Sequence, residues 1–140
     1  MSEEEVAAFL AGRRKVHVAT VNRDGAPHLV PMYFLLVDGA VTFWTYTRSQ
    51  KVRNLERDPR ITVMAEAGEA YFDLRGVQIA GRAHLTTDPD AVLAFGERLY
   101  ERQFGPLDAA ARAHVAASAR KRTRVTVEPL RLVSWDHSRL

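Results

Sequence analysis

Cysteine is absent from this chain, and its absence removes several kinds of chemistry at once. No disulfide can stabilise the fold, no thiolate can act as a nucleophile, and zinc cannot be held by sulfur ligands. Long apolar runs are also missing, because no window approaches the roughly 18 consecutive apolar residues that a membrane helix needs. The first residues, MSEEEVAAFL, are acidic where a signal peptide is basic. The sequence therefore predicts a cytoplasmic protein with no membrane span.

The composition is that of a folded globular protein. Hydrophobic residues make up 46% of the 140 residues and charged residues 26%, with no low-complexity tract. We therefore expect a single domain over residues 1–140. The five histidines show no metal-ligand spacing, so no metal site is predicted. They are His17, His28, His84, His114 and His137.

The formal net charge is +3, and cations gather late in the chain. This cluster has no interleaved aromatic residues and no recognisable nucleic-acid-reading motif. A solvated face is therefore favoured over a nucleic-acid partner. The clustered cations are Arg112, Arg120, Lys121, Arg122 and Arg124.

The first half of the sequence predicts one helix and then three antiparallel strands. Ser2 and Glu5 form a capping-box pattern ahead of an amphipathic segment. Tight-turn sequences, NRDG and DG, separate alternating apolar segments, which favours a meander of three strands. The predicted strands are Lys15–Val21, Pro27–Val37 and Val41–Thr47.

The middle predicted strand is apolar on both faces. Leu29 and Tyr33 alternate with Val30 and Phe34, so neither face is polar. An antiparallel strand of this kind needs two covers. The interior of a small barrel and a partner subunit would supply them.

The second half alternates helices with further strands. Pro59 ends one short helix, Pro89 begins another, and Gly76 and Gly81 suggest bends at a barrel corner. Together the pattern predicts a mainly β fold, a small antiparallel barrel with inserted helices. The predicted elements are a helix at Ser49–Asp58, strands at Ile61–Ala67 and Tyr71–Leu85, helices from Thr87 and over Leu107–Lys121, and a last strand at Arg124–Trp135 kinked at Pro129.

Known catalytic motifs are missing. The chain has no nucleophile elbow, P-loop or dinucleotide fingerprint, and Asp73 is a lone strand carboxylate. We therefore predict no catalytic side chain, and a cofactor would supply the chemistry.

The segment TYTRSQKVRNL predicts an anion site. It runs from a strand end into a helix start, where free N–H groups and the helix dipole favour a phosphate. Thr45, Thr47 and Ser49 add hydroxyl donors, and Lys51 and Arg53 add positive charge. The alternative is that Ser49 only caps the helix and both cations are solvated.

Several motifs together resemble one known family. They are the turn N-x-D-G-x-P-H, the strand P-M-Y-F, the segment F-W-T-x-T-x-S-x-K-x-R-N-L-x-x-D-P-R, and later L-R-G-V-Q-I-A-G-R-A and V-S-W-D-H. The pattern resembles the pyridoxamine 5′-phosphate oxidase-like family, and within it the flavin/deazaflavin oxidoreductase B branch, the coenzyme F420-dependent enzymes of actinobacteria. The resemblance implies an FMN-binding split β-barrel with short α-helices. It also implies a homodimer whose cofactor lies in a groove between subunits.

The resemblance also implies cofactor-binding residues. Thr45, Tyr46, Thr47 and Ser49 would line the phosphate site, and Lys51 would neutralise its charge. Asn54 would add a polar contact. Backbone of Val30, Pro31 and Met32 would run along the tricyclic ring.

The chain departs from true pyridoxamine phosphate oxidases, since it carries HLVPMYF in place of R-x-V-L-L-K and Gly76 in place of a flavin-contacting glutamine. The resemblance therefore implies a deazaflavin-dependent oxidoreductase that transfers a hydride to or from an electron-poor small molecule. Tyr33, Trp44 and Trp135 are candidates for lining the acceptor pocket or for core packing. An FMN-dependent reductase or oxidase is the alternative, as is a non-catalytic flavin- or tetrapyrrole-binding dimer.

The deazaflavin cofactor carries an oligoglutamate tail, which gives the late basic cluster a second interpretation. Arg120, Lys121, Arg122 and Arg124 would attract this polyanion.

Overall fold

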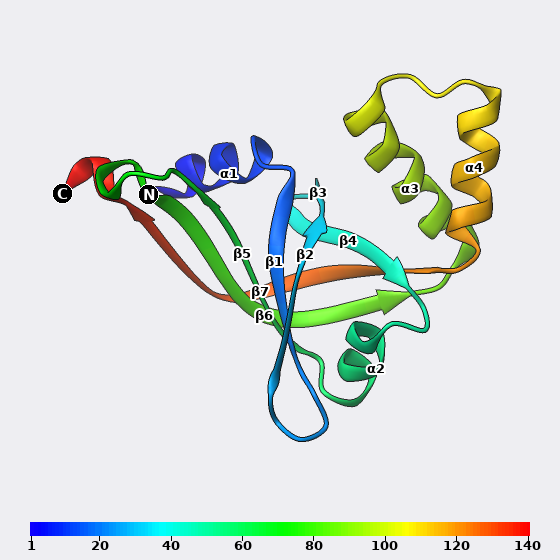
Figure 1. The fold of residues 1–140 in the computed structure, drawn as a ribbon, viewed down its shortest axis with the longest axis horizontal. Helices are drawn as coiled ribbons and strands as arrows, with labels where there is room; N and C mark the ends of the chain where they lie inside the picture. Colours follow the sequence, from blue (N-terminus) through cyan, green and yellow to red (C-terminus); the bar gives the residue numbers. More distant parts are fainter.

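The computed structural model describes residues 1–140 as a strongly curved, seven-stranded antiparallel sheet with four α-helices around it (Figure 1). The strand order is β2-β1-β5-β6-β7-β4-β3. The strands are β1 (Lys15–Val21), β2 (Pro27–Tyr33), β3 (Leu35–Val37), β4 (Ala40–Tyr46), β5 (Arg60–Ala67), β6 (Arg75–Thr86) and β7 (Arg122–Asp136). The helices are α1 (Glu3–Ala11), α2 (Gln50–Arg57), α3 (Pro89–Phe104) and α4 (Ala109–Ala119).

The expected strand Pro27–Val37 is divided in two at Phe34. This residue is buried, and its N–H donates to the carbonyl oxygen of Arg14 at 3.1 Å instead of continuing a strand ladder. As a result β2 lies at one edge of the sheet and β3 at the other. The predicted three-strand meander is therefore wrong, because the middle segment does not pair with both neighbours along its length. The predicted mainly β fold, an antiparallel barrel with helices, is confirmed. Phe34 alone joins β2 and β3, the two edge strands of the curled sheet.

The long strands β6 and β7 bend together. Their register shifts between Ala80 and Gly81, where Gly81 lies opposite Pro129. This confirms the predicted bend at Gly81. Gly76 instead keeps regular pairing with Trp135, whose ring fills the space that a Cβ atom would need. The predicted strand start at Tyr71 is wrong, because Tyr71–Asp73 forms a 3-10 turn ahead of β6.

Two apolar cores lie on opposite sides of the sheet. The larger fills the concave interior and includes Val18, Phe43 and Val125. The smaller lies outside β4, where Trp44 packs against α3 and α4 with its ring edge toward Phe95. Phe43 and Trp44, which follow one another in β4, thus pack into different cores. The position of Trp44 on the outer side also makes it part of a hollow near the candidate site.

The helix starts follow their sequence signals. Ser2 caps α1 in a complete capping box, Ser49 caps α2, and Asp88 caps α3 with proline at the first turn. Helices α3 and α4 stand as a hairpin at one end of the sheet, and the two chain termini lie together at the other (Figure 1). No helix combines the length and the apolar character required to cross a membrane.

Candidate functional site

The end of β4, the start of α2 and the start of β7 are tied together by short polar contacts. The Thr47 N–H donates to the Lys121 carbonyl oxygen at 2.9 Å, and the Thr47 and Thr123 hydroxyls lie 2.9 Å apart. The Ser49 hydroxyl accepts from the Val52 N–H at 3.3 Å, which fixes the first turn of α2. These contacts hold the predicted anion segment against β7, a strand far away in sequence.

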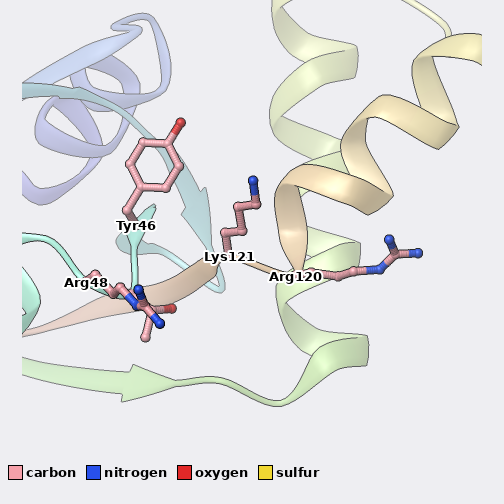
Figure 2. Close-up of a pocket in the computed structure, with 5 residues that line it drawn as sticks. Tyr46, Arg48, Arg120 and Lys121 are labelled. Atoms are coloured by element: carbon pink, nitrogen blue, oxygen red, sulfur yellow. The ribbon is translucent and has the colours of Figure 1, made fainter.

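A hollow of about 660 Å³ opens beside this junction. It is lined by Tyr46, Thr47, Arg48, Arg120 and Lys121. In Figure 2 the side chains of Tyr46 and Lys121 extend in the same direction, whereas Arg120 points away across the base of the α3–α4 hairpin. Three of the five lining residues are cations, so the hollow has the charge that an anionic ligand needs.

Arg122 lies at the centre of the cation cluster. Its guanidinium carbon is 3.9 Å from the centre of the Tyr46 ring and 5.0 Å from that of Trp44. Such stacking holds a guanidinium in place without using its hydrogen-bond donors. The Nε atoms of Arg122 and Arg124 are buried and have no hydrogen-bond partner. Buried donors without partners are costly, so this region is suited to an acceptor from a ligand.

The cations of this region have no carboxylate partners. Ion pairs occur elsewhere in the molecule, but none includes a member of the cluster. None of these cations is therefore neutralised by an ion pair within the chain. The cluster consists of Arg48, Lys51, Arg120, Lys121, Arg122 and Arg124.

The pKa of Lys51 reflects the same excess of positive charge. Its pKa is lowered, first by partial burial and then by the positive charge of Arg122. Both causes disfavour the ammonium form. A phosphate bound beside Lys51 would offset both effects, because it supplies the missing opposite charge.

Asn54, an expected cofactor contact, is fully buried. Its amide nitrogen donates to the hydroxyl of Thr20 at 3.0 Å and to the side-chain oxygen of Asn22 at 2.9 Å. Its oxygen accepts from Gln50 and Arg57. The side chain is therefore committed to joining α2 to β1, and its influence on a ligand would be indirect.

The expected ring-binding backbone lies on β2. Val30 and Pro31 pair with Val18 and His17 of β1, and Met32 reaches a second hollow. That hollow, about 240 Å³ in volume, also takes in Tyr33, Trp44 and Arg122. Two of the three candidate acceptor-pocket aromatics thus come together. Trp135 does not join them, because it packs on Gly76 along another part of the sheet.

Arg48 is a site residue that the sequence interpretation missed. Arg122 was expected in the late basic cluster, either solvated or attracting the cofactor tail, and before the last strand, whereas it is the first residue of β7. The alternation of Arg122 and Arg124 with buried Thr123 and Val125 has period two and could have shown that both arginines share one face. Nothing in the sequence could show that Tyr46 stacks on this face.

No three His, Asp or Glu side chains are grouped so that they could hold a metal ion. What is assembled is a row of cations and hydroxyls next to an aromatic hollow, on the edge of a curled antiparallel barrel. The fold is that of the split-barrel class, and the site is a basic hollow beside an aromatic one.

The chain belongs to the pyridoxamine 5′-phosphate oxidase family, whose model matches residues 2–134. Among solved structures it is similar to a conserved hypothetical protein, Rv2991, from Mycobacterium tuberculosis. That match has 38% identity and a TM-score of 0.92 and covers 98% of this chain and 86% of the other. An F420 reductase is 25% identical with a TM-score of 0.72, over 90% of this chain and 94% of that one. The split-barrel resemblance drawn from the sequence motifs is thereby confirmed.

The same fold occurs in more distant proteins. HutZ, a heme storage protein from Vibrio cholerae, is 19% identical with a TM-score of 0.73 over 94% of this chain and 92% of the other. At this identity the similarity concerns the fold alone. No curated protein matches the chain.

Proposed function

We propose that this protein is a deazaflavin-dependent oxidoreductase that uses coenzyme F420 to transfer a hydride to or from an electron-poor small molecule. The observation that carries the proposal is the unpaired cation cluster around Lys51 and Arg122, next to the hydroxyls of Thr47 and Ser49. This arrangement suits a phosphate-bearing cofactor. The similarity to an F420 reductase over most of both chains supports the choice of deazaflavin.

The residues present fit such a cofactor. Thr45 is buried, whereas Tyr46, Thr47 and Ser49 are accessible at the end of β4 and the start of α2. Lys51 would neutralise the phosphate, and Met32 would approach the ring from β2. When bound, the deazaflavin would supply the hydride chemistry. The protein's own task would be to orient the acceptor and to exclude water, which needs no titrating side chain.

The cofactor tail offers a role for the cations farther from the ring. Arg48, Arg120 and Lys121 line a hollow with few apolar groups. A chain of carboxylates leaving the phosphate site would meet these three cations. Raising the salt concentration would weaken this part of the binding, since exposed charges are screened.

The active form would be a homodimer in a cytoplasmic setting, with a single domain per chain. The exposed apolar residues of β2 and β7 support this assembly. Leu29 is 65% exposed and Leu130 is 70% exposed. A second copy covering them would also close the open side of the cofactor groove.

A direct titration tests the proposal. Ligand-free protein would be titrated with coenzyme F420 and, separately, with FMN while the fluorescence of each cofactor is followed. We expect tighter binding of F420. Lys51→Ala should weaken it about 10- to 100-fold, because a charge-assisted hydrogen bond contributes about 1.5 to 3 kcal/mol.

Arg98→Ala is the matched control, because it removes one exposed cation of α3 outside the cluster. It should leave the affinity unchanged. Tighter binding of FMN would instead favour a flavin reductase or oxidase. Binding of neither cofactor would overturn the proposal and leave Ser49 and Lys51 as parts of a capped, solvated helix.

A further inference from the structure

The second hollow lies next to the cation cluster and has a different character. It is formed by β2, β4 and the last turns of α3, and six of its eight lining residues are hydrophobic. Tyr33 and Phe104 stand at its margins, 49% and 72% exposed. Large aromatic side chains left open around a hollow of about 240 Å³ are suited to covering a flat apolar molecule.

Arg122 is the one charged residue of this hollow, and Gln103 is its other strongly polar residue. The guanidinium is held by stacking on Trp44 and Tyr46, so it does not need to be ordered when a ligand binds. It forms no ion pair, and its buried Nε has no acceptor. A fixed guanidinium with free donors at an aromatic wall recognises a carboxylate by paired hydrogen bonds.

The walls of this hollow are themselves fixed. The Tyr100 hydroxyl lies 2.9 Å from His114 Nε2 of the neighbouring helix. Trp44 is buried, and its ring fits against Gly96 so closely that no side chain could stand there. The hollow is therefore shaped by packed groups, which favours selection by shape as well as by charge.

We infer that this hollow binds the hydride acceptor and selects a flat, apolar carboxylic acid, whose carboxylate pairs with Arg122. The inference rests on the proposed function, because Arg122 also influences Lys51 and so lies between the two sites. An acid held there has its apolar part between Tyr33 and Phe104 and lies alongside Met32. This position brings the acceptor to the side of β2 where the ring is expected.

The test compares two probes of similar shape that differ in charge, naphthoate and naphthylmethanol. Their affinities for the cofactor-free full chain are measured by isothermal titration calorimetry. We expect naphthoate to bind about tenfold more tightly, since a charge-assisted pair contributes roughly 1.4 kcal/mol or more. Arg122→Gln should abolish this preference while leaving naphthylmethanol binding unchanged within about threefold, a split that loss of structure would not produce.

Further variants separate the apolar contribution of the hollow to binding from the contribution of the Arg122 charge. Phe104→Ala should weaken both probes by the same factor, because it removes apolar contact only. Arg131→Gln, the matched loss of a cation elsewhere on β7, should change neither. Arg122→Lys should keep part of the preference, because charge remains but paired donation is lost.

Two results would overturn the inference: equal affinity for both probes in the unchanged protein, or a preference for naphthoate that survives Arg122→Gln. The first needs no variant to fold. Because no cofactor is present, these outcomes are distinct from failure of the F420 titration. Acid preference without cofactor binding would reject the proposed function and keep this site.

Discussion

Asn54 shows how a polar side chain can determine the position of a site without touching a ligand. Its amide joins Thr20 and Asn22 of the β1 region to helix α2. Asn54→Ala should lower the free energy of unfolding by about 1 to 3 kcal/mol, because buried donors and acceptors lose their partners. Urea denaturation would measure the change. Arg53→Ala, exposed on the same helix, should stay within about 0.5 kcal/mol, and an equal loss in both variants would contradict this account.

Gly96 lies where helix α3 crosses the Trp44 ring. A Cβ atom at this position would overlap the ring, and Val115 of α4 closes the remaining space. Gly96→Ala should therefore destabilise the protein by about 1 to 3 kcal/mol, although alanine alone favours a helix by about 1 kcal/mol. Thermal unfolding would measure this. Arg98→Ala on the exposed face is the control, and a stabilised Gly96→Ala would show that the helix does not need this close approach.

At the residue scale, part of the candidate site could be predicted from the sequence. Ser49 and Lys51 are recognisable because a cap and a cation share one helical turn. The burial of Asn54 could not be predicted from the sequence, since two of its partners, Thr20 and Asn22, lie more than 30 residues earlier in the chain. The stacking of Arg122 on Tyr46 could not be predicted for a related reason, because only the pairing of β4 with β7 brings the two residues near each other.

At the scale of elements, the first helix and the last turn of the chain are joined by one ion pair. Arg139 donates to Glu5 at 2.7 Å, and this hydrogen bond, before all other causes, lowers the pKa of Glu5 from 4.5 to about 2. A carboxyl with a lowered pKa in the folded state stabilises the fold above its unfolded pKa. The stabilisation is lost as the pH falls from about 4.5 to about 2.

Comparing Glu5→Gln with the unchanged protein tests this pair. The variant should have a lower Tm at pH 7, and the difference should shrink as the pH falls toward 2, where Glu5 is protonated in the unfolded state and about half protonated in the folded state. Circular dichroism melts over this pH range would measure it. Glu4→Gln, on the same turn but without a cation partner, should show little change at either pH. A Tm difference that does not shrink toward pH 2 would assign the effect to the capping box of α1 instead.

Elements with local signals were predictable, and those that depend on distant pairing were not. The strand Lys15–Val21 and the starts of α2 and α3 follow from alternation and capping residues close in sequence. The division of Pro27–Val37 at Phe34 does not, because apolar residues continue across it. What divides this segment is that its two halves pair with strands at opposite edges of the sheet, a property of the whole barrel.

At the scale of the whole molecule, part of β7 remains uncovered. Residues 128–133 are exposed on both faces, and β4 pairs with β7 only over residues 122–126. Leu130, Leu132 and Val133 are therefore apolar and exposed beside the open edge, with Leu132 and Val133 on opposite faces of the strand. Exposed apolar residues of this kind on a sheet are typical of subunit contacts.

Leu132→Glu should convert the proposed homodimer into a monomer, because it introduces a charge on each side of the two-fold contact without a partner for either. Light scattering coupled to gel filtration would show half the mass. Ala117→Glu, an exposed change on α4, should leave the dimer intact. Coenzyme binding should fall with dimer loss if the groove is shared between subunits. A monomeric Leu132→Glu protein with full cofactor affinity would instead mean that each chain holds the cofactor alone, through its own cation cluster.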